Sequence, residues 1–252
     1  MIAKTLYHKA ETKEELSANF ADIEKRIELA CQRANRSIDS VRLLPVTKTV
    51  DEKTMRMACE LGYHYFGENK VQEAQEKSES MSDLPIEWSI IGHLQTNKVK
   101  YIARFANEFQ ALDSLKIAQK LQERLALEDR SMDVLVQVNT SNEESKYGLH
   151  PTKVSDFIEQ IKKFDRLHVK GLMTLALLSS DTEKVRDCFI LLRELRDKLK
   201  ENLPSHICMN ELSMGMSGDF EVAIEEGATI IRIGQALFGA RTLPDSYYWP
   251  EK

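Results

Sequence analysis

A lysine stands where a short apolar run near the start of the chain ends. In the segment RLLPVTKTV, residues 42–50, the apolar run predicts a buried strand, and Lys48 follows it. An amine attacks a carbonyl only in its neutral form, so a reactive lysine needs a pKa lowered by partial burial or by neighbouring cations. Lys48 is therefore a candidate for a Schiff base with an aldehyde.

Polar side chains end the other strand-like runs of the sequence in the same way. Any one of them is most simply a strand end that turns toward water. Together they predict a ring of hydrogen-bonding groups at one end of successive strands, in the following order along the chain: Glu68 and Asn69, His93, Asp113, Asn139, Thr174, Ser213, and Arg232 with Gly234.

Two glycine-containing turns close the last two of these runs, LSMGMSGDF and IRIGQALFG. The backbone N–H groups of Gly234 and Gln235 would open a short helix and point at an anion, and the Ser213 hydroxyl with the backbone of 214–218 would add donors. Either motif alone is no more than an ordinary glycine turn. A reactive lysine opposite a phosphate cradle fits an aldehyde that carries a phosphate, and pyridoxal 5′-phosphate has both groups.

Strand-like and helical patterns alternate through most of the chain. A helix is expected over about 12–36, with a capping box formed by Thr12 and Glu15, and a second clear helix over 183–200. Gly227 is expected to end a helix in a left-handed conformation just before the last strand. Eight strand-like runs are expected, at 42–48, 64–69, 87–92, 109–113, 133–139, 168–176, 210–215 and 229–234.

Eight alternating strands in a 252-residue chain predict the α/β class and a single (β/α)8 TIM barrel, a fold that typically takes about 250 residues. The barrel is expected over about 42–240, with the extra N-terminal helix across its bottom or beside its first strand and a short C-terminal tail. Residues 1–252 are expected to form one domain. The polar strand ends then meet at the carboxyl-terminal mouth, where such barrels place their reactive groups.

Composition excludes several classes of function. The net charge of −5 comes without a basic block, so no nucleic-acid partner is expected. No apolar run approaches the ~20 residues of a membrane span, and the first residues lack the apolar core of a signal peptide, so we expect a cytoplasmic protein. Four scattered cysteines without metal-ligand spacing predict reduced thiols and no metal site.

Six segments together resemble one known family. LLPVTKTV, FGENKVQEAQEK, IIGHLQTNK, VNTSNEESKYGL, KGLMTLA and LSMGMSGDFEVAIEEGATIIRIGQALFG span residues 43–239 in order. This pattern resembles the pyridoxal phosphate homeostasis protein family, whose fold is similar to the barrel domain of alanine racemase. The resemblance implies an alanine racemase-type barrel that binds pyridoxal phosphate (PLP) and takes part in its intracellular homeostasis.

The resemblance also implies roles for individual residues. Lys48 would form the Schiff base, Asn69 would lie near the ring, and Arg232 would face the pyridine nitrogen. Ser213 and the turn of Gly234 and Gln235 would bind the phosphate. Met214 is expected to pack at the barrel mouth against the ring.

A guanidinium stays protonated, so at the ring nitrogen Arg232 can only donate, and the ring becomes a poorer electron sink than one that faces a carboxylate. Four residues at three sites depart from the family pattern. Ser89 replaces a histidine, Gln110 with Ala111 replaces a histidine–serine pair, and Gln235 replaces a threonine, which removes a hydroxyl from the expected phosphate site.

Three functions remain open at this point. The resemblance implies a monomeric carrier that buffers PLP or delivers it to apo PLP-dependent enzymes without catalytic turnover. A PLP-dependent amino-acid racemase needs a second acid or base, which alanine racemase takes from a β domain, whereas only RTLPDSYYWPEK follows the barrel here. A lysine aldolase acting on sugar phosphates is disfavoured because such enzymes carry the lysine on a middle strand. The roles of His93 and Lys146 stay undecided, and a loop position is the simpler interpretation of each.

Overall fold

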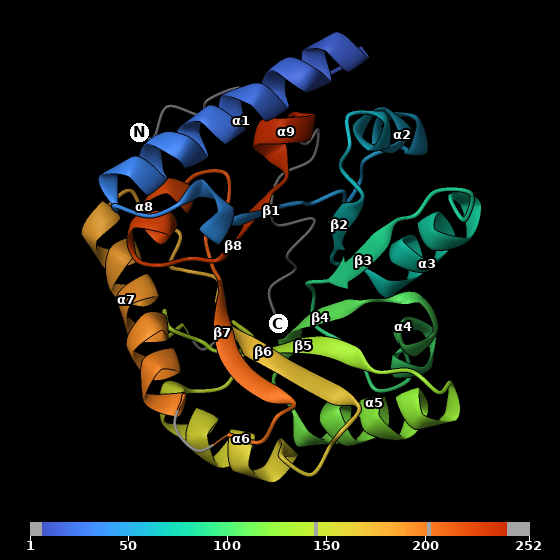
Figure 1. Cartoon of the computed structure of the whole chain (residues 1–252), viewed down its shortest axis with the longest axis vertical. Coiled ribbons are helices and arrows are strands. Elements are labelled where there is room, and N and C mark those ends of the chain that lie inside the picture. The colour runs from blue at the N-terminus through green and yellow to red at the C-terminus, as the bar shows by residue number, and fades with distance from the viewer. Residues whose placement is uncertain (1–6, 144–145, 201–202, 241–252) are drawn as a thin grey trace.

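Eight parallel strands form one sheet that curls into a barrel (Figure 1). The computed structural model describes residues 7–143, 146–200 and 203–240, so Tyr247 and Tyr248 lie outside the described residues. Neighbouring strands follow the order β1-β8-β7-β6-β5-β4-β3-β2. A single parallel bridge between Val46 and Gly67 joins the first strand to the second and closes the ring. The predicted (β/α)8 TIM barrel is confirmed.

All eight predicted strands are present, and their ends differ from the predicted ones by a few residues. The strands are β1 Arg42–Pro45, β2 Tyr65–Glu68, β3 Glu87–Ile90, β4 Glu108–Leu112, β5 Met132–Gln137, β6 Leu167–Met173, β7 Ile207–Ser213 and β8 Ile230–Ile233.

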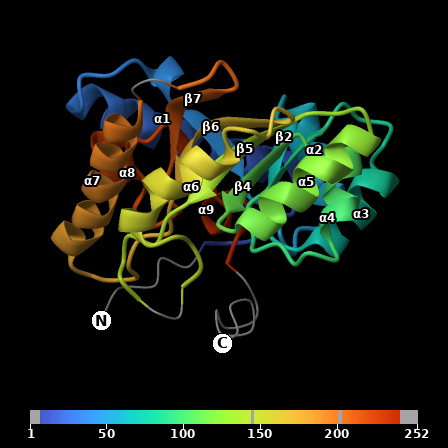
Figure 2. The same ribbon diagram turned by 90° about the horizontal axis from the view of Figure 1, so that it is seen from below.

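Helices surround the strands on the outside of the barrel, and the view turned by 90° shows them to the left and right of the strands (Figure 2). Two 3₁₀ turns, Ile38–Ser40 and Pro151–Lys153, add to them. The α-helices are α1 Lys13–Arg33, α2 Glu52–Glu60, α3 Val71–Ser80, α4 Val99–Phe105, α5 Leu115–Leu127, α6 Val154–Ile161, α7 Thr182–Leu199, α8 Phe220–Glu225 and α9 Gln235–Phe238.

The N-terminal helix α1 packs against α8, α9 and α2 in the outer ring (Figure 1). Its capping box is confirmed, since the Thr12 side chain accepts from the N–H of Glu15 and the Glu15 side chain accepts from the N–H of Thr12. The helix buries Phe20, Ile23 and Ile27. The helix therefore does not lie across the bottom of the barrel, which was one of its two expected positions. It covers the side of the barrel where β8 and β1 meet (Figure 1).

The last helix before β8 ends as its glycine predicts. Gly227 follows the last turn of α8 with a φ of +98°, and its N–H donates to the carbonyl of Ile224. This left-handed residue returns the chain to the barrel at Ile230. Within the residues that the structure describes, no helix combines the length and apolar character needed to cross a bilayer.

Candidate functional site

Lys48 lies in a tight turn that follows β1, and its residue is 8% exposed. The strand itself ends at Pro45, earlier than predicted, and the next residue, Val46, bridges Gly67 at the seam of the barrel, where β1 meets β2. The N–H of Val50 donates to the carbonyl of Thr47 at 2.9 Å, which places Lys48 second in a four-residue turn.

A cavity of about 190 Å³ opens beside this turn. Of the seven predicted site residues, Lys48, Gly234 and Gln235 line it. Its other lining residues come from the turn itself, from α2, from α9 and from segments next to α9: Lys9, Val46, Thr49, Val50, Thr54, Phe238, Gly239 and Ala240. The structure thus brings the predicted reactive amine and the predicted phosphate turn to one cavity.

The turn of Gly234 and Gln235 reaches this cavity because β8 pairs with β1. The N–H of Val46 donates to the carbonyl of Ile233 at 2.8 Å, so the residues after both strands emerge side by side. A Cβ at Gly234 would lie 3.2 Å from the carbonyl oxygen of Val46, closer than most such contacts. Glycine at position 234 therefore allows the turn to approach the Val46 carbonyl without a steric conflict.

Ser217, rather than Ser213, lies beside the turn of Gly234 and Gln235. Its Oγ accepts from the N–H of Ala236 at 3.3 Å, in the first turn of α9. Sequence reasoning proposed the Ser213 hydroxyl, although the backbone segment 214–218 that it named includes Ser217. The signal that could have separated them is where β7 ends, since Ser213 still belongs to the strand.

Asn69 follows β2 on the other side of the seam. It lies two residues beyond Gly67 just as Lys48 lies two residues beyond Val46, and these two form the bridge. Its Oδ1 is a buried atom without a hydrogen-bond partner among the described residues. A Cβ at Gly92 would come within 2.1 Å of the Asn69 carbonyl oxygen, so only glycine lets the end of β3 approach so closely. A buried orphan acceptor near Lys48 fits a bound polar ligand.

Arg232 points into the barrel from β8 and is 3% exposed. Its Nη1 donates to the Ser213 Oγ at 2.6 Å and its Nη2 to the Thr174 carbonyl at 2.7 Å. Burial lowers the pKa of Arg232 to about 10, while the negative charges of Asp219 and Glu108 act to raise it. The guanidinium is still protonated at neutral pH, so it can act only as a donor.

Two of the positions that depart from the family pattern, Ser89 and Gln110, extend this contact into a buried polar line. Ser213 Oγ donates to Gln110 Oε1, and Gln110 Nε2 donates to Glu108 Oε2, both at 2.6 Å. Ser89 Oγ donates to the same carboxylate oxygen at 2.6 Å, and Arg42 Nη2 donates to Glu108 Oε1 at 2.7 Å. The glutamine and serine therefore supply the donors that a buried carboxylate requires.

Several other polar strand ends hold loops rather than the cavity. The His93 ring stacks on Tyr147 with centroids 3.9 Å apart. Asp113 Oδ2 accepts from the N–H of Gly148 at 3.2 Å. Lys146 Nζ donates to the Ala176 carbonyl at 2.9 Å and pairs with Glu143. These contacts tie the loop after β5 to its neighbours.

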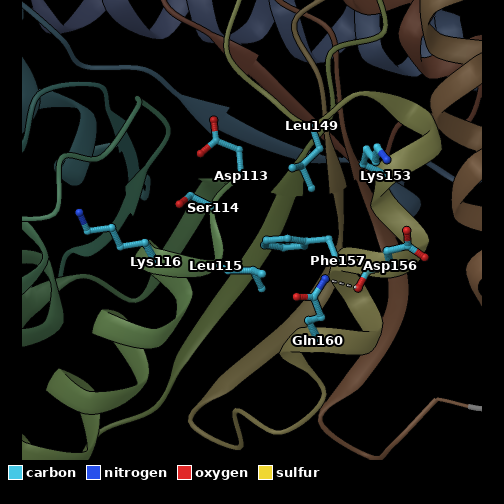
Figure 3. Close-up of a pocket in the computed structure, with 9 residues that line it drawn as sticks. All are labelled: Asp113, Ser114, Leu115, Lys116, Leu149, Lys153, Asp156, Phe157 and Gln160. Atoms are coloured by element: carbon cyan, nitrogen blue, oxygen red, sulfur yellow. Dashed lines mark hydrogen bonds between the residues drawn. The ribbon is translucent and has the colours of Figure 1, made fainter.

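A second cavity of about 470 Å³ lies between the start of α5 and helix α6. Figure 3 shows Phe157 extending between Leu115 and Leu149 at its centre, with Lys116 and Lys153 at its sides. Of the polar strand ends, only Asp113 lines it. Lys48 and the glycine turn therefore belong to the smaller cavity.

The remaining predicted contact residue, Met214, is fully buried directly after β7. Asn69, Ser213, Met214 and Arg232 do not line the cavity of Lys48. No group of three or more histidine, cysteine or acidic residues among the described parts of the chain could hold a metal ion.

Sequence reasoning missed a buried charged group next to Lys48. Lys77 Nζ contacts Glu68 Oε1 and Glu73 Oε1, both at 2.7 Å, and Lys77 is 7% exposed. The four-residue spacing of Glu73 and Lys77 on a helix was the available signal, although that spacing usually marks a surface pair.

Comparison with known proteins points to one family. The family model for the alanine racemase N-terminal domain matches residues 19–242. The pyridoxal phosphate homeostasis protein of Aquifex aeolicus is 43% identical over 86% of this chain and 94% of its own length. That of Escherichia coli is 35% identical over 90% and 97%.

Solved structures show the same relationship. PipY of Synechococcus elongatus, solved with PLP bound, is 32% identical with a TM-score of 0.76, and covers 86% of this chain and 100% of its own. Alanine racemase of Clostridium difficile shares the fold alone, at 16% identity and a TM-score of 0.66 over 91% of this chain and 57% of its own. Fold, motifs and relatives thus agree that this chain belongs to the pyridoxal phosphate homeostasis protein family, built on the alanine racemase N-terminal domain.

Proposed function

We propose that this chain binds pyridoxal 5′-phosphate as a Schiff base on Lys48 and buffers or delivers it inside the cell, without catalytic turnover. The observation that carries the proposal is the shared cavity of Lys48, Gly234 and Gln235 at the junction of β1 and β8. The names of the relatives and the PLP-bound PipY support the same ligand. We expect a cytoplasmic monomer whose recipients are apo PLP-dependent enzymes.

Three residues that line the cavity, together with Asn69 across the seam, suit this ligand. Its aldehyde condenses with a neutral amine and releases one water molecule. Lys48 supplies the amine, and Asn69 offers its buried, unpartnered Oδ1 to a ligand hydroxyl or protonated nitrogen. The backbone N–H groups at Gly234 and Gln235 bind the phosphate, and we assign the neighbouring hydroxyl to Ser217.

Arg232 is the proposed partner of the ring nitrogen. Ser213 and the Thr174 carbonyl orient its guanidinium, so we give Ser213 this orienting role in place of phosphate binding. A permanent donor at the ring nitrogen discourages protonation there and limits the ring as an electron sink. This chemistry favours storage of the cofactor over carbanion reactions.

The decisive experiment is borohydride reduction of the protein loaded with PLP, followed by peptide mass spectrometry. We expect the added mass on the peptide that contains Lys48, and no visible absorbance band of a Schiff base in Lys48→Ala. Lys53→Ala is the matched control, since that side chain is exposed on α2. Modification of a different lysine, or an unchanged band in Lys48→Ala, contradicts the proposal.

Incubation of the loaded protein with L- and D-alanine tests the absence of turnover. Measurable interconversion of L- and D-alanine would support a racemase instead of a carrier. It would leave the assignment of Lys48 as the Schiff-base lysine unchanged. Transfer of PLP to an apo enzyme at a rate above that of free dissociation supports delivery. Light scattering of the purified chain tests the expected monomer.

A further inference from the structure

The turn that carries Lys48 has a backbone conformation that needs support. Thr49, directly after the lysine, has a φ of +65°, which a β-branched side chain rarely adopts. Glycine or asparagine usually occupies this third position of a turn. A strained residue persists where its surroundings hold it in place, and such residues cluster at functional sites.

Helix α3 supplies the contacts that hold this turn. Lys77 Nζ donates to the Thr47 carbonyl at 2.7 Å, so the residue before Lys48 is bound from α3. Glu73 Oε1 accepts from the N–H of Thr49 at 2.6 Å, so the residue after Lys48 is bound as well. Lys77 and Glu73 thus hydrogen-bond to the backbone on both sides of Lys48.

The side chains of Glu73 and Lys77 also form an ion pair with each other. Glu73 Oε1 lies 2.7 Å from Lys77 Nζ, and both belong to one face of α3. Glu68 Oε1 takes the third contact of the ammonium at 2.7 Å and also accepts from Thr47 Oγ1 at 2.7 Å. An ammonium has three donors, and all three of Lys77 are engaged.

We propose that Glu73 and Lys77 are positioning residues that fix the turn of residues 47–50 and present the Lys48 amine to the cavity before the ligand arrives. The inference rests on the proposed function, because it assumes that Lys48 is the amine that reacts. The same contacts predict that the buried Lys77 does not compete for the aldehyde, because its three N–H bonds are committed to Thr47, Glu68 and Glu73. Preorganisation of this kind speeds a reaction by removing misplaced geometries of the reacting group.

The test compares Glu73→Ala with Glu73→Gln. Alanine removes the acceptor of the Thr49 N–H, whereas glutamine keeps an Oε1 acceptor for both contacts. Glu76→Ala is the matched control, because Glu76 is exposed on the same helix. The rate constant for the appearance of the Schiff-base band is measured at fixed PLP concentration over a range of pH.

We expect Glu73→Ala to form the linkage about ten- to a hundredfold more slowly at every pH, the penalty of a misplaced reacting group. Glu73→Gln should stay within about threefold of wild type, since a hydrogen-bond acceptor remains, and Glu76→Ala should match it. Thermal unfolding of each variant verifies that it is folded. A purely structural role of Glu73 would lower the melting temperature and leave the rate constant of the folded protein unchanged.

A second measurement needs no ligand. Hydrogen exchange of the Thr49 amide in the cofactor-free protein should be at least about tenfold faster in Glu73→Ala than in wild type, and unchanged in Glu76→Ala. Faster exchange with an unchanged rate of linkage overturns the positioning role, and so does unchanged exchange. If wild type forms no linkage at all, the proposed function fails, while the exchange result still decides whether Glu73 holds the turn.

Discussion

Glu68 is the most deeply buried carboxyl group near the proposed reactive lysine, and its replacement gives a sharp prediction about stability. It lies at the end of β2, 0% exposed. Its Oε1 accepts from Thr47 and Lys77, but its Oε2 has no partner among the described residues. In Glu68→Gln the amide oxygen can keep both contacts, and the amide nitrogen takes the place of the orphan oxygen.

The pH dependence follows from the pKa of this carboxyl group. Burial raises the pKa of Glu68 from 4.5 to about 7, against the attraction of Lys77. Between these values the folded protein keeps the proton that the unfolded chain has lost, so the free energy of unfolding falls as the pH rises through this window. At about 1.4 kcal/mol per pKa unit the loss is about 3 kcal/mol, complete above the folded-state pKa.

Urea unfolding of both proteins at several pH values between 4 and 8, at constant ionic strength, measures this loss. We expect the stability of Glu68→Gln relative to wild type to grow by about 3 kcal/mol from the acid to the alkaline end of the range. Other titrating groups, such as Asp219, are present in both proteins and cancel in the difference. Glu76→Gln controls for the removal of a surface charge. A difference that stays constant with pH would refute the reasoning, and one of opposite slope would mean that Lys77 outweighs burial.

Three further predictions concern other parts of the fold. Thr12→Ala should lower the free energy of unfolding by about 1 kcal/mol in urea, because it removes one half of the capping box of α1. Gly92→Ala should weaken both thermal stability and PLP affinity, since its Cβ would lie 2.1 Å from the Asn69 carbonyl, and unchanged affinity in a titration would speak against the placement of Asn69. Gln110→Leu should lower the free energy of unfolding in urea by about 1–3 kcal/mol, because it removes one donor to Glu108 Oε2 and the acceptor of the Ser213 hydroxyl, and a neutral result would contradict the buried polar line.

The fold was predictable because its strands are recognisable in the sequence. In a parallel barrel each strand is buried on both faces, so it appears as a short apolar run, and these runs alternate with helices of clear periodicity. The capping box at Thr12 and the left-handed Gly227 were equally local signals. The strand order then followed from the eight alternating units. The ends of the strands were less exact, because the bridge from Val46 to Gly67 depends on residues 21 positions apart.

The candidate site was predictable only in part. The sequence grouped Lys48, Gly234 and Gln235 because each ends a predicted strand or opens a predicted helix, and the structure places all three on one cavity. The choice between Ser213 and Ser217 was not, because both fit the pattern and only the last residue of β7 decides which one faces the barrel interior. The contacts of Lys77 with Thr47 and of Glu73 with Thr49 were also hidden, since they span 30 and 24 residues of chain.

A single bridge between Val46 and Gly67 joins β1 to β2 at the seam of the barrel. The turn of Lys48 follows β1 on one side of this seam, and Asn69 follows β2 on the other side. A ligand that contacts residues on both sides of the seam binds only while β1 and β2 are together. Its binding free energy therefore adds to the free energy needed to separate these two strands. The occupied protein should then resist separation of β1 from β2 more strongly than the empty one. Closure of the barrel and retention of a bound ligand are thereby thermodynamically coupled.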